Sequence, residues 1–321
     1  MAFFNVEGIG VKGIVSTVPK EIGDNLNDEN IPKEKGQKIL DSTGIRYRRL
    51  SRESVTTSDL CEFSAVNLLE NKKIDRSNIE VVVFLSQTPD YVLPATSTIL
   101  QHKLGLPNSA LAFDINLGCS GFVYGLSVVT SLLEKIPNPN ASALLLVGDT
   151  SSKLTNKRDL STYPLFGDCG TATLLTKEKG AKITFDLFSD GKGWDAIRVD
   201  HGAFRKQISK DSEELISNDG VNFRRERDLY LNGMDVFSFG ITKVPKAVKD
   251  YYEKTNLSKE DFDFFIFHQA NMFMNEKIRK KLKLEEEKVP YTLYDYANTS
   301  SATIPLTLTT KLKDKIKNNT K

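Results

Sequence analysis

The chain has 321 residues, and its 44 lysines and arginines almost cancel its 42 aspartates and glutamates, which leaves a formal net charge of +2. Such a balance gives no reason to expect a nucleic acid or a membrane as the main partner. The 3 cysteines are widely spaced and form no Cys-x-x-Cys pair, which excludes a disulfide framework and a cysteine-rich zinc site. There is no signal peptide and no apolar run of membrane-spanning length, so we expect a cytoplasmic protein.

The first half of the chain alternates apolar strands with helices, a pattern typical of an α/β fold with a largely parallel sheet. The predicted strands cover residues 6–18, 79–86, 110–113, 143–147 and 170–175, and residues 43–50 are a predicted basic turn followed by a strand. The predicted helices cover residues 59–72, capped by Thr57 or Ser58, then residues 96–104 and 122–133. The strand at 79–86 is apolar along most of its length, which predicts burial on both faces.

The second half repeats this alternation. A strand begins at Ala181, a long polar segment follows at 204–228, and a helix is predicted over about 236–252. A second apolar strand at 262–267 leads to a His-Gln-Ala-Asn sequence and a strongly basic helix. Residues 177–180 are polar and predict a turn, so we divide the chain into an N-terminal half, 1–178, and a C-terminal half, 179–321.

Cys119 lies where a predicted strand turns into a predicted helix, between Gly118 and Gly121. Glycine tolerates backbone angles that other residues resist, and it lets a substrate approach the main chain. A thiol at the start of a helix is close to unpaired N–H groups and to the positive end of the helix dipole, and both favour the thiolate. The position therefore suits a nucleophile, and a small buried core cysteine is the alternative.

The two halves match at a constant offset of 182 residues, as between Ser86 and His268. The offset also aligns strand 81–85 with 263–267, Gln87 with Gln269, Asn116 with Asn298, and Cys119 with Ser301. If a pseudo-two-fold axis relates the halves, Cys119, His268 and Asn298 meet at strand ends, where α/β proteins place their sites. The alternatives are that His268 is a hydrogen-bonded core histidine and that Asn298 is a turn asparagine.

The repeat also predicts an incomplete second half. The counterparts of the strands at 143–147 and 170–175 would fall beyond residue 321. We therefore expect the closing strands of the C-terminal half to be missing, or the sheet to be completed in another way.

Four motifs in combination resemble those of a known family. They are Asn116-Leu117-Gly118-Cys119-Ser120-Gly121, Phe166-Gly167-Asp168-Cys169-Gly170, His268-Gln269-Ala270-Asn271 and Asn298-Thr299-Ser300-Ser301-Ala302-Thr303-Ile304-Pro305. With Thr43-Gly44-Ile45 near the start, the chain resembles the β-ketoacyl-acyl-carrier-protein synthase III family over essentially its whole length. The resemblance implies a thiolase-type fold, with two similar halves in five α-β-α-β-α layers, and a homodimer.

The resemblance also implies a reaction, a decarboxylating condensation in fatty-acid or related acyl-chain biosynthesis without a cofactor. Cys119 would take the acyl group from an acyl thioester, on coenzyme A or on an acyl carrier protein. His268 and Asn298 would hold the carbonyl of malonyl-carrier and stabilise the enolate formed as carbon dioxide leaves. These residue types fit, since thioester exchange needs a thiolate and an enolate needs fixed hydrogen-bond donors.

Further site residues follow from the same resemblance. The acyl pocket would be lined by Leu93, Phe166 and Phe237. Leu93 belongs to a loop over 87–94 that would cross to the partner subunit. Lys277, Lys280 and Lys281 would dock the acidic acyl carrier protein. The alternative for the loop around Leu93 and for the segment around Phe166 is an ordinary turn, and the alternative for the lysines is a merely solvated helix.

Several positions depart from the family pattern. Lys38 and Ser42 stand where the family has a tryptophan and an arginine that sandwich the adenine of coenzyme A. A further adenine-side arginine falls at Leu160, with Arg158 close by, and a carrier-docking arginine falls at Phe273. These departures argue against coenzyme A as the acyl donor.

Two other functions remain open from the sequence. One is an acyltransferase of the same fold that passes the acyl group to an oxygen or nitrogen nucleophile without decarboxylation. The other is a weakly active partner subunit, because the incomplete second half would lack a strand pair that supplies one backbone donor to the oxyanion hole.

Overall fold

The computed structural model describes residues 2–217, 219–316 and 320, and within them the largest sheet has five strands. In spatial order these are β1 (Ala2–Thr17), β7 (Cys169–Leu187), β6 (Ser142–Asp149), β4 (Ile79–Leu85) and β5 (Leu111–Ile115). β4 is parallel to β5 and β6, whereas β7 is antiparallel to β6 and β1. The predicted α/β fold with parallel central strands is therefore confirmed.

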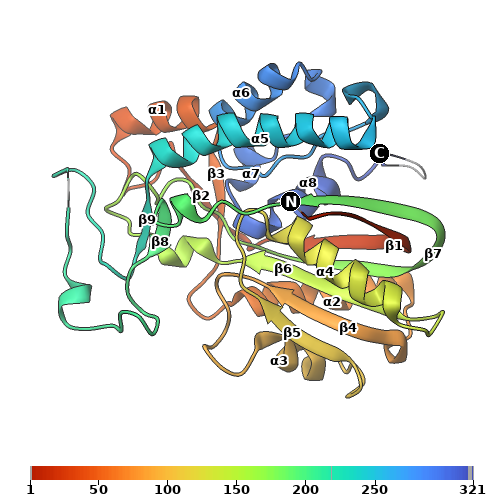
Figure 1. The fold of residues 1–321 in the computed structure, drawn as a ribbon. Helices are drawn as coiled ribbons and strands as arrows, with labels where there is room; N and C mark the ends of the chain where they lie inside the picture. The colour runs from red at the N-terminus through yellow and green to blue at the C-terminus, as the bar shows by residue number, and fades with distance from the viewer. Residues whose placement is uncertain (1, 218, 317–319, 321) are drawn as a thin grey trace.

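Helices cover both faces of this sheet, with α4 (Gly121–Lys135) in front and α2 (Thr57–Lys72) and α3 (Thr96–Lys103) behind it in Figure 1. Side chains of β4 and β6 alternate between the two layers. Val81, Val83 and Leu145 share a cluster with α4, while Val82 and Leu144 share one with α2 and α3. Burial on both faces explains why these strands lack an alternating polar pattern.

Helix α2 begins earlier than predicted. Thr56, and not Thr57 or Ser58, is its N-cap, because Asp59 completes a capping box with Thr56. The predicted helices α3 and α4 are confirmed to within two residues.

The other elements lie mostly above and to the left of the sheet in Figure 1. They are α1 (Lys33–Thr43), α5 (Gly233–Thr255), α6 (Met272–Leu282), α7 (Leu293–Tyr296), α8 (Thr303–Thr310) and the small sheets β2 (Glu21–Asp24) with β3 (Tyr47–Leu50) and β8 (Ile197–Val199) with β9 (Leu229–Leu231). Among the described residues, no helix combines the length and hydropathy needed to cross a membrane.

The prediction of a strand over residues 262–267 is wrong, since none of the described strands pairs with this segment. Phe265 and Phe267 instead pack into a cluster with α5 and α6, and the Phe262 ring lies 6.0 Å from the Tyr252 ring. A strand needs a neighbour for its backbone hydrogen bonds, and an apolar pattern does not supply one. The second large sheet that a five-layered arrangement requires is likewise not formed among the described residues.

The predicted turn at 177–180 is also wrong, because these residues lie within β7. β1 pairs with β7 on both sides of them, through Ile9 with Lys177 and Glu7 with Lys182. The register shifts between these pairs, opposite Gly8, and Gly180 has a φ of 86°. The polar residues therefore form an irregularity in a continuous strand.

Candidate active site

Cys119 lies in the short turn between β5 and α4. The Gly121 N–H donates to the Gly118 carbonyl at 2.7 Å and closes this turn. The end of the Gln87 side chain occupies the space that a Cβ atom on residue 118 would need, so any other residue there would have to displace it. Cys119 is exposed while the other two cysteines are buried, which makes it the thiol that a substrate can reach.

The electrostatic setting of Cys119 differs from the sequence-based expectation. Desolvation raises the pKa of its thiol to about 11, and the charge of Asp149 adds to this increase. A hydrogen bond involving the backbone of Cys119 acts in the opposite direction but is outweighed. The helix start therefore does not by itself yield a thiolate, because desolvation of the sulfur outweighs the backbone hydrogen bond even though the residue as a whole is exposed.

His268 lies just before α6, with one ring nitrogen held and the other uncommitted. Its Nδ1 is 2.8 Å from Oγ1 of Thr303, the first residue of α8. Its Nε2 is buried and has no hydrogen-bond partner in the described part of the chain. Burial lowers the pKa of His268 to about 4, although the Ser300 backbone opposes this, so the ring is neutral at physiological pH.

Asn298 is held through its backbone and its side-chain oxygen. Its N–H donates to the Leu165 carbonyl at 3.0 Å, and its own carbonyl accepts from the Gly167 N–H at 3.1 Å. These bonds form a bridge beside the buried Phe166. Oδ1 accepts from the Ser300 N–H at 2.9 Å, while Nδ2 makes no hydrogen bond to any described residue.

The loop after Asn298 packs against the turn that carries Cys119. It forms a short 3-10 helix, η7 (Ser300–Ala302), and a Cβ atom on Gly121 would lie 3.4 Å from the Ser301 Cβ. Ser301 also donates to the buried Asp149 through its N–H at 3.2 Å and its hydroxyl at 2.5 Å. Segments far apart in the sequence, around Cys119 and around Ser301, therefore meet at the carboxyl ends of the strands.

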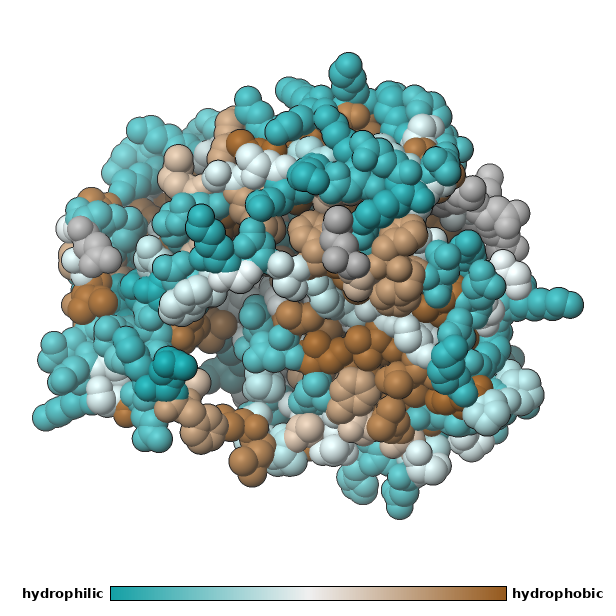
Figure 2. Space-filling model, in the orientation of Figure 1, coloured by the Kyte–Doolittle hydropathy of each residue, from teal (hydrophilic) through white to brown (hydrophobic). Residues whose placement is uncertain are grey.

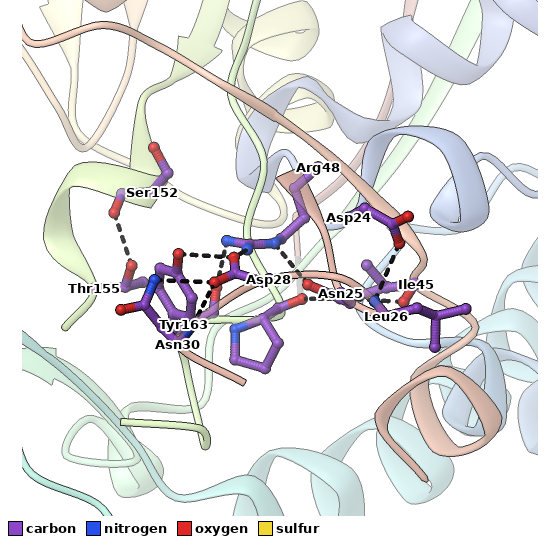
Figure 3. Close-up of polar contacts among 11 residues, drawn as sticks. Asp24, Asn25, Leu26, Asp28, Asn30, Ile45, Arg48, Ser152, Thr155 and Tyr163 are labelled. Carbon is purple, nitrogen blue, oxygen red and sulfur yellow. Dashed lines mark hydrogen bonds and ion pairs between the residues drawn. The ribbon is translucent and has the colours of Figure 1, made fainter. Parts of the chain in front are cut away.

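A buried ion pair supports the segment that bridges Asn298 (Figure 3). Arg48 is fully buried in β3 and donates to Asp28 at 2.7 Å. It also donates to the Tyr163 carbonyl at 3.0 Å and to the Asn25 Oδ1 at 2.8 Å. The segment that starts at Tyr163 is thus fixed by Arg48 at one end and hydrogen-bonded to Asn298 at the other.

The remaining pocket and docking residues are spread over the surface. Leu93 is 78% exposed, beside Tyr91 and Val92, and precedes a cis peptide bond. Phe237 is partly buried on α5, and its ring stacks on the Phe273 ring with 5.5 Å between the ring centres. The sequence alone had not indicated this contact.

The three predicted docking lysines lie on the exposed face of α6. Lys277 is 5.2 Å from the Phe273 ring centre, and Lys281 donates to the Ile241 carbonyl at 3.0 Å. Lys280 is exposed between them. Within the described residues, none of the three forms an ion pair, so their charges are available to a partner.

Three residues of this region had no assigned role in the sequence analysis. Thr303 stood within a recognised motif, and Asp149 is a polar residue at the end of an apolar strand, a position that often faces a site. Arg48 carried no such signal, because a basic residue among others is usually exposed.

Comparisons with known proteins agree with this arrangement. Residues 113–191 match the family described as 3-oxoacyl-[acyl-carrier-protein (ACP)] synthase III, and residues 252–321 match its C-terminal part. The beta-ketoacyl-[acyl-carrier-protein] synthase III of Clostridioides difficile (strain 630) is 34% identical over 93% of this chain and 88% of its own. The second such synthase of Staphylococcus epidermidis is 34% identical over 92% of this chain and 87% of its own.

Solved structures show the same similarity. The 3-oxoacyl-(acyl-carrier protein) synthase of Burkholderia xenovorans LB400 has a TM-score of 0.89 and 36% identity, covering 98% of this chain and 88% of its own. A synthase III of Thermus thermophilus has a TM-score of 0.80 and 28% identity, over 95% and 90% of the two chains. The fold is therefore thiolase-like, and the protein is an acyltransferase of the condensing type. The chain belongs to the 3-oxoacyl-[acyl-carrier-protein] synthase III family, whose reaction is part of fatty-acid biosynthesis.

Proposed function

We propose that Cys119, His268 and Asn298 carry out the decarboxylating condensation. In the first half-reaction the Cys119 thiolate attacks an acyl thioester, and the donor thiol leaves. In the second, malonyl-carrier loses carbon dioxide to give an enolate, and the enolate carbon attacks the acyl-cysteine. A β-ketoacyl thioester forms, and the Cys119 thiolate is released.

The observation that carries this proposal is the pair of uncommitted nitrogens, Nε2 of His268 and Nδ2 of Asn298. Both side chains are held at their other end, so their remaining N–H groups can point at a developing enolate oxygen without reorganising. The Thr303 hydroxyl can donate either to the Ser300 carbonyl at 3.2 Å or to Nδ1, and we propose that it donates to Nδ1, which leaves the proton of the ring on Nε2. The ring is neutral, so its proton is available over the whole physiological range of pH.

We infer that the acyl donor is a carrier thioester. On α1, Lys38 and Ser42 are both exposed, and neither can stack on an adenine ring. At the other expected contact, Leu160 donates its N–H to Asn222, and the Arg158 guanidinium lies 4.6 Å from the Phe223 ring. Nothing in this set reproduces the aromatic sandwich that coenzyme A would need.

The exposed lysines of α6 supply a basic surface for an acidic carrier protein. Lys280→Glu is expected to raise the KM for malonyl-carrier several-fold and leave kcat unchanged, because it weakens encounter and not chemistry. Lys210→Glu, on the exposed segment after β8, serves as the matched control. An equal rise in both variants would mean that net charge, and not this surface, is responsible.

We further propose a homodimer that forms along β5. This strand lies at the edge of the sheet and its far side is unpaired in the described structure. Leu111 is 47% exposed, and Tyr91, Val92 and Leu93 lie in the adjoining loop. Figure 2 shows apolar side chains gathered on the face where β5 and the start of α4 lie. An unpaired edge with an apolar flank is suited to a second copy of the same strand, and the partner's loop would then bring Leu93 to the acyl pocket.

The division into halves at residues 178 and 179 also stays a proposal. The constant offset of 182 residues supports it, since it aligns Ser86 with His268 and Asn116 with Asn298.

Mass spectrometry of the protein after incubation with an acyl thioester tests the first half-reaction. We expect one acyl adduct, on Cys119, that is absent from Cys119→Ala. Malonyl-carrier is then added and carbon dioxide is measured with the product. Acyl transfer to an oxygen or nitrogen nucleophile without carbon dioxide would support the alternative acyltransferase, and an absence of adduct would leave only a partner subunit.

A further inference from the structure

Asp149 is a buried carboxyl group that the proposed reaction does not use. It ends β6 and its exposed fraction is 0%. Desolvation raises the pKa of Asp149, while hydrogen bonds from Ser301 and Gln87 act to lower it. A buried carboxyl destabilises a fold unless its oxygens are hydrogen-bonded, so its contacts show what it holds together.

One oxygen of Asp149 faces the loop beside the cysteine. Oδ1 accepts from the Gln87 N–H at 2.8 Å and from the Ser86 hydroxyl at 3.1 Å. The Gln87 side chain in turn lies against Gly118, one residue before Cys119. Oδ1 therefore fixes the residue that packs against the cysteine turn.

The other oxygen faces the loop of the second half. Oδ2 accepts both the N–H and the hydroxyl of Ser301, at 3.2 and 2.5 Å. Ser301 lies three residues after Asn298 and two before Thr303, whose hydroxyl holds His268. Ser301 is also the residue that the repeat aligns with Cys119, so one carboxyl joins equivalent loops of the two halves.

We propose that Asp149 is a positioning residue that fixes the Cys119 turn and the Asn298 loop relative to each other. The two half-reactions share one acyl group, and the enolate must reach the acyl-cysteine across this junction. A misplacement of about 1 Å between reacting groups costs roughly 100-fold in rate. The inference rests on the proposed roles of Cys119, His268 and Asn298.

The charge of Asp149 has a second, measurable effect. Desolvation raises the pKa values of Cys119 on its turn, Cys61 on α2 and Cys169 on β7, and a negative charge on Asp149 adds to each increase. His268, the other titratable group of the site, is neutral in the range of the assay. Where Asp149 is ionised, removing its charge favours the thiolate of Cys119 at the same time as it loosens the junction.

The test compares full-length wild type with Asp149→Asn. Iodoacetamide labelling of each cysteine is followed by peptide mass spectrometry between pH 7.5 and 9.5, and condensation is followed by carbon dioxide release with product. We expect faster labelling of Cys119 and condensation slowed roughly 10-fold or more. Cys61 and Cys169 should stay unlabelled, which shows that the variant is folded.

Two further variants separate the loss of the Asp149 hydrogen bonds from the loss of its charge. Ser301→Ala removes one donor to Asp149 but keeps the charge, so it should slow condensation without faster labelling. Asp168→Asn is the matched buried control, because Asp168 accepts from Ser51 and Ser152 and does not contribute to the pKa of Cys119. The proposal is overturned if Asp149→Asn condenses at the wild-type rate, or if it merely loses activity and folding in step with Asp168→Asn. A wild type that neither acylates nor condenses would overturn the proposed function instead.

Discussion

Thr303→Val tests how His268 acquires its role. The change removes a hydroxyl that lies 2.8 Å from Nδ1 and alters the side-chain volume little. While that hydroxyl donates to Nδ1, the proton of the neutral ring is on Nε2. Without it, we expect Nδ1 itself to carry the proton, since nothing then donates to this nitrogen. Nε2 then becomes an acceptor and repels an enolate oxygen.

The expected cost follows from the number of donors lost. One of the two uncommitted N–H groups disappears, and removal of one oxyanion donor costs about 100-fold or more in rate, or about 2.7 kcal/mol. Asn298 loses no hydrogen bond of its own, since its contacts run to Ser300, Leu165 and Gly167, although Ser300 loses the 3.2 Å contact between its carbonyl and the Thr303 hydroxyl. Decarboxylation of malonyl-carrier should therefore fall about 100-fold. Acyl transfer to Cys119 should stay close to the wild-type rate.

The two half-reactions are measured separately, as carbon dioxide release and as the acyl adduct on Cys119. Thr303→Ser keeps the hydroxyl and is the matched control, expected to retain most of the decarboxylation. The reasoning is refuted if Thr303→Val decarboxylates like wild type. It is also refuted if both half-reactions fall together, because a general loss of structure would then explain the effect.

Three more predictions follow from the same contacts. Asp28→Asn should lower the free energy of unfolding at pH 7 by about 3 kcal/mol, because it leaves the buried Arg48 without a counter-ion. Desolvation acts to raise the pKa of Asp28, but hydrogen bonds and the charge of Arg48 hold it below its ordinary value of 3.8, so this stability is present above that pH and lost on further acidification. In urea titrations, the difference in free energy of unfolding between wild type and Asp28→Asn should be smaller at pH 3 than at pH 7. An equal difference at both pH values would contradict this prediction. Alkylation of Cys119 should keep accelerating with pH up to about 11, whereas a plateau near pH 7 would disprove the raised pKa. Leu93→Asp should convert the proposed dimer to a monomer, as measured by light scattering, while Phe63→Asp, on the outer face of α2, should not.

The sequence predicted most of the first half, since its signals are local. Buried strands such as β4 and β6 carry long apolar runs, and a cysteine between two glycines is recognisable at the start of α4. The ends of α2, α3 and α4 moved by at most two residues, as where Asp59 completes the cap at Thr56, but β1 and β7 extend further than predicted and α1 was not predicted.

The failures share one physical cause, which is dependence on distant partners. Residues 262–267 have the composition of a strand, but a strand exists only beside another. The pKa of Cys119 depends on desolvation and on Asp149, neither of which appears in the local sequence. The supporting contacts of Arg48 reach residues over 100 positions away, such as Tyr163 at a separation of 115.

Because β7 is continuous, it limits where this protein can be divided into fragments or carry an insertion. Residues 170–177 and 182–187 both pair with β1. A break between 178 and 179 would therefore divide one strand into two pieces that both remain paired with β1. Fragments separated there should reassociate on mixing and should not behave as independent modules. A fluorescent tag or an inserted domain is better tolerated in the exposed stretch at 203–211, where no described strand runs.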